Sequence, residues 1–157
     1  MDKHSKAVRS YNMSRIRSTN SKPEEIVRKY LFAQGFRYRK NDKRYPGKPD
    51  IVLPKYKTVI FVNGCFWHKH DCGRFVWPSS NEDFWRAKIQ RNIERDAEQM
   101  AQLRSDGWRV IVVWECELKK STANTRLTQL AAEIRDESWR KDLGEKQTCE
   151  EAKNECT

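Results

Sequence analysis

Three short runs of apolar, mostly β-branched residues constrain the fold of this chain more than any other feature. The runs at 50–53 and 58–62 are separated by a turn around 54–57, so we expect them to pair as a hairpin. The run at 108–114 follows a long segment of helical periodicity, and we expect it to be a buried strand. A further strand is predicted at 36–40, where aromatic and basic residues alternate.

Helix signals surround these strands. A first helix is expected to begin at Ser21 and to end at Gly35, a second to fill roughly 80–107, and a third to cover roughly 121–139. Residues 1–20 are polar and basic, and we expect an arm or a short irregular helix there. The predicted order of helix, three strands, helix, strand and helix is typical of an α/β sandwich with a mixed sheet.

The length of 157 residues fits one domain, which we expect over 1–140 with a polar, disordered tail over 141–157. No apolar run is long enough for a transmembrane helix, and the N-terminus lacks the apolar region of a signal peptide. The five cysteines are odd in number, which argues against a disulfide framework. We therefore expect a cytoplasmic protein, and metal binding becomes an option for some of the thiols.

The positive charge is concentrated in the first third of the chain. Lys and Arg number 32 against 22 Asp and Glu overall, a formal net charge of +10. Residues 1–60 hold 16 of these basic residues and only 5 of the acidic ones. A localised basic excess is typical of a protein that binds a polyanion, although a basic surface that serves only solubility has the same composition.

Asp50 stands at the head of the strand predicted at 50–53. A lone Asp at that position is most simply a cap at the rim of the sheet, whereas a functional carboxylate would face a cleft. Glu24, in the first turn of the first predicted helix, and His68, after the second strand of the hairpin, could reach the same rim. These groups suit Mg²⁺-assisted phosphodiester hydrolysis, because Mg²⁺ prefers hard oxygen ligands and an imidazole can take the proton of the attacking water.

One departure from the common nuclease pattern is informative. A P-D at a strand start with an upstream helical Glu resembles the restriction-endonuclease-like fold, whose usual third element is E-x-K on the second strand. The matching place here is 61–63, F-V-N, so that element is absent. The run N-G-C-F-W-H-K-H-D-C (63–72) instead closely resembles the Vsr family of very-short-patch mismatch-repair endonucleases. Other segments over about residues 1–118 match in order and spacing: R-S-x-N-M (9–13), P-G-K-P-D (46–50), N-I-E-R-D (92–96), G-W-R-V (107–110) and V-W-E-C (113–116).

The resemblance implies an α/β/α sandwich and a role for each matching position in the nuclease centre. Asp50 is then the principal Mg²⁺ carboxylate, and Val62 offers its backbone carbonyl as a second metal ligand. His68 resembles the general base, and Glu24 the helical acidic residue near the site. Asn63 stands where the best-known member has a His, so any proton-transfer or phosphate role of that position is open, although an amide can still donate a hydrogen bond.

A second, structural metal site is also implied. By spacing alone, His70, Cys72 and Cys116 are more simply unrelated than joint ligands. The resemblance implies that they bind Zn²⁺ together with Asp96 from the long helix, because zinc prefers four N, S or O ligands in a tetrahedron. Cys65 is predicted to be a packed core thiol.

Two adjacent aromatic residues, Phe66 and Trp67, lie in a polar loop beside the predicted base. One of them could pack inward, but the resemblance implies a wedge that enters the DNA beside a mismatched thymine. Unstacking a base step costs a few kcal/mol and is cheapest at a mismatch. Met13 matches a Met that enters from the other groove. Other DNA-contacting positions are predicted on the same arm: Arg9, Asn12 and Arg15.

The resemblance implies an Mg²⁺-dependent enzyme that nicks double-stranded DNA on the 5′ side of the thymine in T:G mismatches, which arise from deamination of 5-methylcytosine. Such an enzyme acts as a monomer alongside a DNA cytosine methyltransferase. General mismatch-repair proteins are further candidate partners, although no residue points to them. The alternatives are a restriction-type or structure-specific endonuclease without mismatch preference, and a catalytically dead, zinc-stabilised DNA-binding module.

Overall fold

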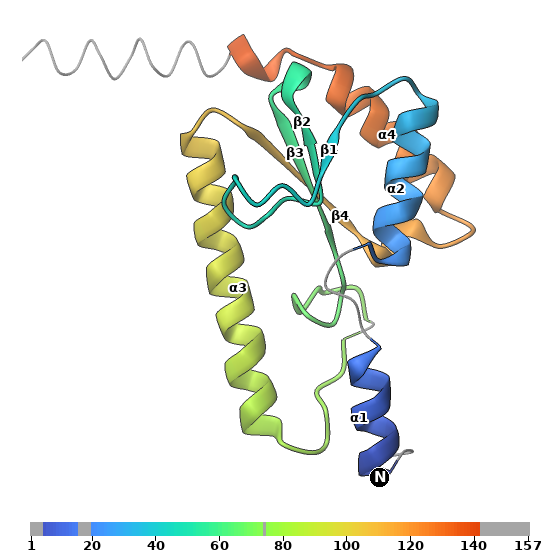
Figure 1. Cartoon of the computed structure of the whole chain (residues 1–157), viewed down its shortest axis with the longest axis vertical. Coiled ribbons are helices and arrows are strands. Elements are labelled where there is room, and N and C mark those ends of the chain that lie inside the picture. Colours follow the sequence, from blue (N-terminus) through green and yellow to red (C-terminus); the bar gives the residue numbers. More distant parts are fainter. Residues whose placement is uncertain (1–4, 16–19, 74, 142–157) are drawn as a thin grey trace, which may run out of the picture.

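A four-stranded mixed sheet forms the centre of the protein (Figure 1). The computed structural model describes residues 5–15, 20–73 and 75–141. The strands lie in the order β1-β2-β3-β4, with the first two pairs antiparallel and β3–β4 parallel. Their bounds are β1 Arg39–Lys40, β2 Ile51–Leu53, β3 Thr58–Asn63 and β4 Arg109–Trp114.

The described part of the chain contains four α-helices: α1 Lys6–Ser14, α2 Lys22–Ala33, α3 Glu82–Ser105 and α4 Ala123–Arg135. Two short 3₁₀ helices, η1 Pro54–Tyr56 and η2 Glu115–Leu118, follow β2 and β4. Helix α2 and helix α4 cover one face of the sheet, and α3 covers the other (Figure 1). None of the helices in the described ranges has the length and apolarity needed to cross a membrane.

Both faces of the sheet are buried, which explains why its central strands are uninterrupted apolar runs. Side chains of β2 and β3 alternate between two cores. Ile51, Leu53 and Ile60 join the larger core beneath α2 and α4. Val52 and Phe61 join a smaller core beneath α3. The continuous apolar pattern therefore reflects a layer of helices on each side.

The predicted order of elements and the mixed sheet are confirmed, but the start of the first strand is shifted. The first strand begins at Arg39 rather than at Phe36, because Phe36 closes the end of α2. Its N–H donates to Leu31 O at 3.0 Å, and Gly35 before it adopts φ +90°. This is the glycine-terminated helix end that the left-handed conformation permits. The tail predicted over 141–157 lies outside the described residues apart from its first position.

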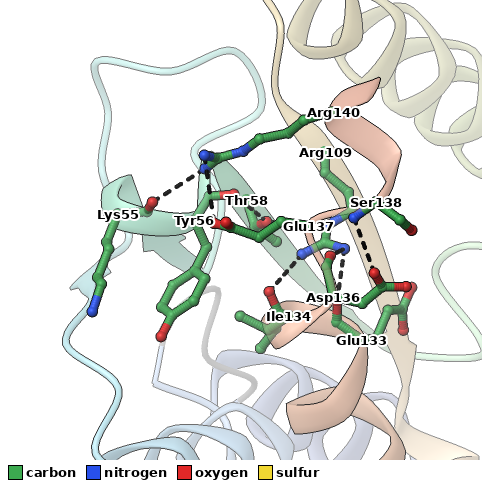
Figure 2. Close-up of polar contacts among 10 residues, drawn as sticks. All are labelled: Lys55, Tyr56, Thr58, Arg109, Glu133, Ile134, Asp136, Glu137, Ser138 and Arg140. Atoms are coloured by element: carbon green, nitrogen blue, oxygen red, sulfur yellow. Dashed lines mark hydrogen bonds and ion pairs between the residues drawn. The ribbon is translucent and has the colours of Figure 1, made fainter. Parts of the chain in front are cut away.

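Arg109, at the start of β4, fastens the end of α4 to the sheet. Figure 2 shows its guanidinium among the last carbonyls of that helix, which have no partner within the helix itself. The guanidinium donates to the carbonyls of Glu133 (2.6 Å), Asp136 (2.9 Å) and Ile134 (2.9 Å). A further N–H donates to the Thr58 hydroxyl at 3.1 Å, so one side chain joins α4 to both parallel strands.

Arg109→Ala should lower the free energy of unfolding by about 2–4 kcal/mol, because it removes several charge-assisted hydrogen bonds and leaves helix-end carbonyls unpaired. Urea denaturation followed by circular dichroism measures this loss. Arg91→Ala is the matched control, since Arg91 is exposed and contacts only the backbone of its own helix, and its cost should stay within about 0.5 kcal/mol. An equal loss in free energy of unfolding for the two variants would contradict this role of Arg109.

Candidate active site and metal centre

Asp50 lies directly before β2 and faces two neighbouring groups. The main-chain N–H of Val62 donates to Asp50 Oδ2 at 2.7 Å. The carboxylate of Glu24 comes from the first turn of α2, and it interacts with Asp50 as well. Glu24 is in turn held by an ion pair with Arg28 and by the N–H of Asn20 at 2.9 Å. The structure thus brings two carboxylates together at the rim of the sheet, as predicted for Asp50 and Glu24.

The pKa of the Asp50 carboxyl is raised to about 7, chiefly by burial and also by the charge of Glu24, against the opposing effect of the Val62 N–H. Two close carboxylates in a desolvated place repel each other unless a cation lies between them. Their hard oxygen atoms are the ligands that Mg²⁺ prefers. The donor set therefore fits a divalent cation at this rim.

The His68 imidazole contacts the Asp96 carboxylate, and the two residues come from different elements. His68 lies in the loop after β3, and Asp96 lies near the middle of α3. Nδ1 of the imidazole contacts the carboxylate, and each side chain is 20% exposed. This contact fixes the ring and leaves Nε2 to act on a substrate. Both residues line one cleft of about 640 Å³ with Asp50.

Asn63 also lines this cleft. It is the last residue of β3 and only 7% exposed, and its position lies directly after Val62. The cleft continues into a second cavity of about 440 Å³, which shares Asn63 and His68 and extends toward Trp67. An amide at the junction of the two cavities can donate a hydrogen bond to a bound group without taking up its proton.

A cluster of four metal-ligand side chains lies beside this cleft. Its members are Cys65, His70, Cys72 and Cys116, whose ligand atoms all lie within 4.8 Å of one another. His70 Nδ1 is 3.6 Å from Cys65 Sγ and 3.5 Å from Cys116 Sγ. A tetrahedral zinc ion with bonds of about 2.0–2.3 Å would place its ligands roughly 3.5–3.8 Å apart, so the spacing fits.

The ligand set differs from the prediction in one member. Asp96, predicted as the fourth ligand, contacts His68 instead, and Cys65 takes its place. Cys65 is indeed buried, at 1% exposure, but it is not only a packed core thiol. Burial raises the pKa of Cys65 to about 12 and also raises that of Cys116. A bound cation would reverse this preference and hold the thiols as thiolates.

An aromatic cluster lies on the other side of the second cavity. Phe66 and Trp67 contact each other edge to face, with ring centroids 5.2 Å apart. Trp85, near the start of α3, lies 5.5 Å from Phe66 and 5.8 Å from Trp67. The ammonium of Lys88 lies over Trp67 at 5.2 Å from its centroid. Both predicted wedge residues are half-buried, so neither is hidden in the core.

Helix α1 brings the predicted arm residues to this cluster. Met13 is 41% exposed, and with Asn12 it lines a cavity of about 570 Å³ that reaches Trp85. The Arg9 guanidinium donates to the Ser80 hydroxyl at 3.1 Å, which holds α1 near the start of α3. Arg15, by contrast, packs over its own helix neighbour: its guanidinium donates to the Tyr11 hydroxyl at 2.8 Å.

Comparison with known proteins identifies the family. The model of the family described as DNA mismatch endonuclease Vsr matches residues 1–74. A type II nicking enzyme, V.NmeAIP of Neisseria meningitidis, is 58% identical over 129 residues, which cover 82% of this chain and 92% of that protein. The DNA mismatch endonuclease Vsr of Escherichia coli K12 is 41% identical over 138 residues, covering 88% and 86%. This chain belongs to the Vsr family. A type II nicking enzyme of Xanthomonas oryzae, V.XorIIP, is 47% identical over 117 residues, covering 74% and 86%.

The protein is therefore a DNA endonuclease, and its Vsr-family site contains residues that sequence reasoning missed. Trp85 lies in the helix expected over roughly 80–107, and helical periodicity does not distinguish a core aromatic residue from one in a surface cluster. Cys65 had a usable signal, since it stands five positions before His70 in a segment rich in Cys and His. No sequence signal pointed to the contact of Asp96 with His68, because the two residues lie 28 positions apart.

In this Vsr-family protein, Trp114 lies between the cluster of three cysteines with His70 and the cleft lined by His68. Its indole stacks on the His70 ring, with centroids 3.9 Å apart and planes 3° from parallel. The edge of the His68 ring packs against the same indole at 6.1 Å. The conformation of the candidate base thus depends on a residue that also contacts a candidate metal ligand.

Asp50→Asn should stabilise the protein in buffer without divalent cations. Folded Asp50 keeps its proton up to about pH 7, whereas the unfolded chain releases it near the ordinary Asp pKa of 3.8, so the free energy of unfolding falls as the pH rises between these values. Asn avoids that cost and still accepts the Val62 hydrogen bond. Urea denaturation at pH 8 should show a gain of about 1–3 kcal/mol that shrinks at pH 5. A less stable variant at pH 8 would contradict the unfavourable placement of this charge.

Cys65→Ser and Asp96→Asn should affect different properties: the first should lower the metal content, and the second should lower the activity. Cys65→Ser removes a ligand, so the purified protein should lose bound metal by elemental analysis and unfold at lower temperature. Asp96→Asn should keep the metal and the fold but lower the endonuclease rate by about 10²-fold or more, because the His68 imidazole loses its anionic partner. Loss of metal from Asp96→Asn, with retention in Cys65→Ser, would restore the ligand set predicted from the sequence.

Proposed function

We propose that this Vsr-family endonuclease nicks double-stranded DNA on the 5′ side of the thymine in a T:G mismatch, with Mg²⁺ in its active site. The observation that carries this proposal is the junction of two cavities at Asn63 and His68. One cavity holds the paired carboxylates, and the other leads to the aromatic cluster around Trp67. Hydrolytic groups and a wedge for the base stack would therefore act on the same short stretch of DNA.

The layers and the placement of the acidic residues support a restriction-endonuclease-like fold. A mixed sheet lies between α3 on one face and α2 with α4 on the other. Asp50 precedes a central strand, and Glu24 is supplied by the helix before the sheet. The strand β3 then ends at Val62 and Asn63, where the E-x-K element of that fold is missing.

The proposed chemistry uses His68 as the general base. Its Nδ1 is held by Asp96, so Nε2 is free to accept a proton from the attacking water. Asp50 and the backbone carbonyl of Val62 would hold Mg²⁺, which supplies charge neutralisation at the phosphate and a more acidic water. Glu24 forms an ion pair with Arg28 and brings a second carboxylate to the same place. The Asn63 amide can donate a hydrogen bond to a phosphate oxygen.

Zn²⁺ is proposed for the cluster of Cys65, His70, Cys72 and Cys116, on the strength of its sulfur and nitrogen donors and their spacing. Its role is structural, because four protein ligands leave no open position for substrate. The site ties the loop after β3 to the end of β4. The residues that it fixes in place include His68 and the pair Phe66 and Trp67.

Mismatch selection is proposed to come from the aromatic cluster and from helix α1. Phe66, Trp67 and Trp85 present ring faces and edges that can enter a base step, while Met13 approaches from α1. Because unstacking is least costly where pairing is already weak, such a wedge favours a T:G pair over a matched pair. The basic residues Arg9 and Arg15 on α1 would meet phosphates, which makes binding salt-dependent.

The wider setting follows from the substrate. T:G pairs produced by deamination of 5-methylcytosine link the proposed activity to a DNA cytosine methyltransferase in the cytoplasm, and a single nick requires only a monomer. Two of the relatives named above are called type II nicking enzymes, not mismatch endonucleases. Nicking of a specific sequence without mismatch preference is therefore the second candidate.

A nicking assay with end-labelled duplexes separates these functions. One duplex carries a single T:G pair in a methyltransferase site, and its control carries a T:A pair in the same sequence. We expect Mg²⁺-dependent cutting of the thymine strand in the first duplex only, and no cutting by Asp50→Ala, which should still bind. Equal cutting of both duplexes would favour the second candidate. Binding without cutting by the unmodified protein would indicate a catalytically dead module.

A further inference from the structure

The connection between β1 and β2, residues 41–48, forms one wall of the catalytic cleft. We call it the basic loop, because it carries Lys43, Arg44 and Lys48 within six positions. Lys43 and Lys48 line the cleft together with Asp50, and Arg95 of α3 lines the same cleft. Three cations thus surround the acidic centre, and none of them belongs to the predicted nuclease or wedge residues.

The basic loop is held in place by its own hydrogen bonds. Asn41 N–H donates to Asp50 O at 3.2 Å, and Lys48 N–H donates to Tyr45 O at 3.1 Å. The Arg44 guanidinium is tied to the Asp42 carboxylate by bonds of 2.9 and 2.6 Å. Arg44 therefore has a partner within the loop, which leaves the two lysines as its cations on the cleft.

The loop is also packed against the body of the protein. The Tyr45 ring contacts the Trp108 ring at 5.0 Å. Gly47 lies so close to α3 and β3 that an added Cβ would stand 2.9 Å from Gln99 Oε1 and 3.2 Å from the Phe61 ring. The backbone of a surface loop that is fixed this firmly can present its side chains at defined positions.

Lys48 has a backbone conformation that costs energy. Its φ is +49°, in the left-handed region where a residue with a Cβ is disfavoured by about 1 kcal/mol or more. Its side chain is half-buried and lines the cleft. A cation beside the carboxylates of this cleft lowers the repulsion that a polyanionic substrate would otherwise meet there.

Helix α3 sets the distance between the basic loop and the aromatic cluster. Trp85 and Gln99 are fourteen residues apart on α3, which corresponds to about 21 Å along its axis. Asp96, the partner of His68, lies between them and only one turn from Gln99. The catalytic dyad therefore separates the basic loop from the wedge residues.

We propose that Lys43 and Lys48 bind the backbone phosphates immediately 5′ of the scissile bond on the cut strand. The direction rests on the proposed function: a wedge at the mismatched thymine lies 3′ of the nick, so the opposite side of the dyad meets the 5′ phosphates. These contacts position the strand and carry no sequence information of their own.

Binding to a short duplex over a range of salt concentrations tests the contact. The variants are Lys43→Gln, Lys48→Gln and their combination. The control is Lys55→Gln, which removes the same charge from the exposed turn at the far end of the β2–β3 hairpin. Each loop variant should reduce the slope of log K against log salt by about 0.9, and the affinity by about fivefold at physiological salt. Unchanged slopes in the double variant would overturn the proposal.

Neutral methylphosphonate linkages test the position. At the first or second phosphate 5′ of the nick, the linkage should weaken binding by the unmodified protein about fivefold and binding by the double variant less than twofold. At 3′ phosphates it should weaken both proteins equally. A 3′ linkage that weakens binding by the unmodified protein more than binding by the double variant would overturn the proposed 5′ position. The salt slopes do not require a mismatch, so equal nicking of T:G and T:A duplexes would refute the proposed specificity and leave the loop contact standing.

Discussion

The parallel pairing of β3 with β4 is the constraint on which the site depends. Its register places Asn63 opposite Trp114 at one end of the two strands. Cys65 and Cys116 each follow two positions later, so the same register brings both thiols to one place. Parallel strands need a long crossover, and α3 provides it, carrying Asp96 back past the strand ends to meet His68.

The loop after β3 has little regular structure, yet it carries the candidate base, three of the four clustered ligands and the wedge pair. Such a segment cannot be held by backbone pairing alone, and the described contacts show what replaces it. Ligand side chains converge on one point, and the Trp114 indole stacks on His70 at 3.9 Å. A metal at that point would stabilise the loop directly, since binding free energy contributes to folding.

Stability and function are separated in space. At the catalytic rim, the pKa of Asp50 is raised to about 7 by burial, so the ionised form needed for a cation weakens the folded state. At the opposite end of the sheet, Arg109 pairs three helix-end carbonyls and a hydroxyl of β3. The strained Lys48 lies on the functional side as well. The raised pKa of Asp50 and the left-handed backbone of Lys48 are thus two unfavourable features on the side where substrate would bind.

The sequence by itself determined the order of the elements, the mixed sheet and the pairing of Asp50 with Glu24, because hydrophobic periodicity and strand-end positions are local signals. Local signals also suggested His70, Cys72 and Cys116 as joint ligands once the family resemblance was added. Only the tertiary structure decided that Cys65 completes that cluster and that Asp96 contacts His68. It also decided that Trp85 joins the aromatic pair and that the 41–48 loop faces the catalytic cleft. These choices depend on how a crossover helix packs across strand ends, and residues far apart in the chain leave no periodic trace of such contacts.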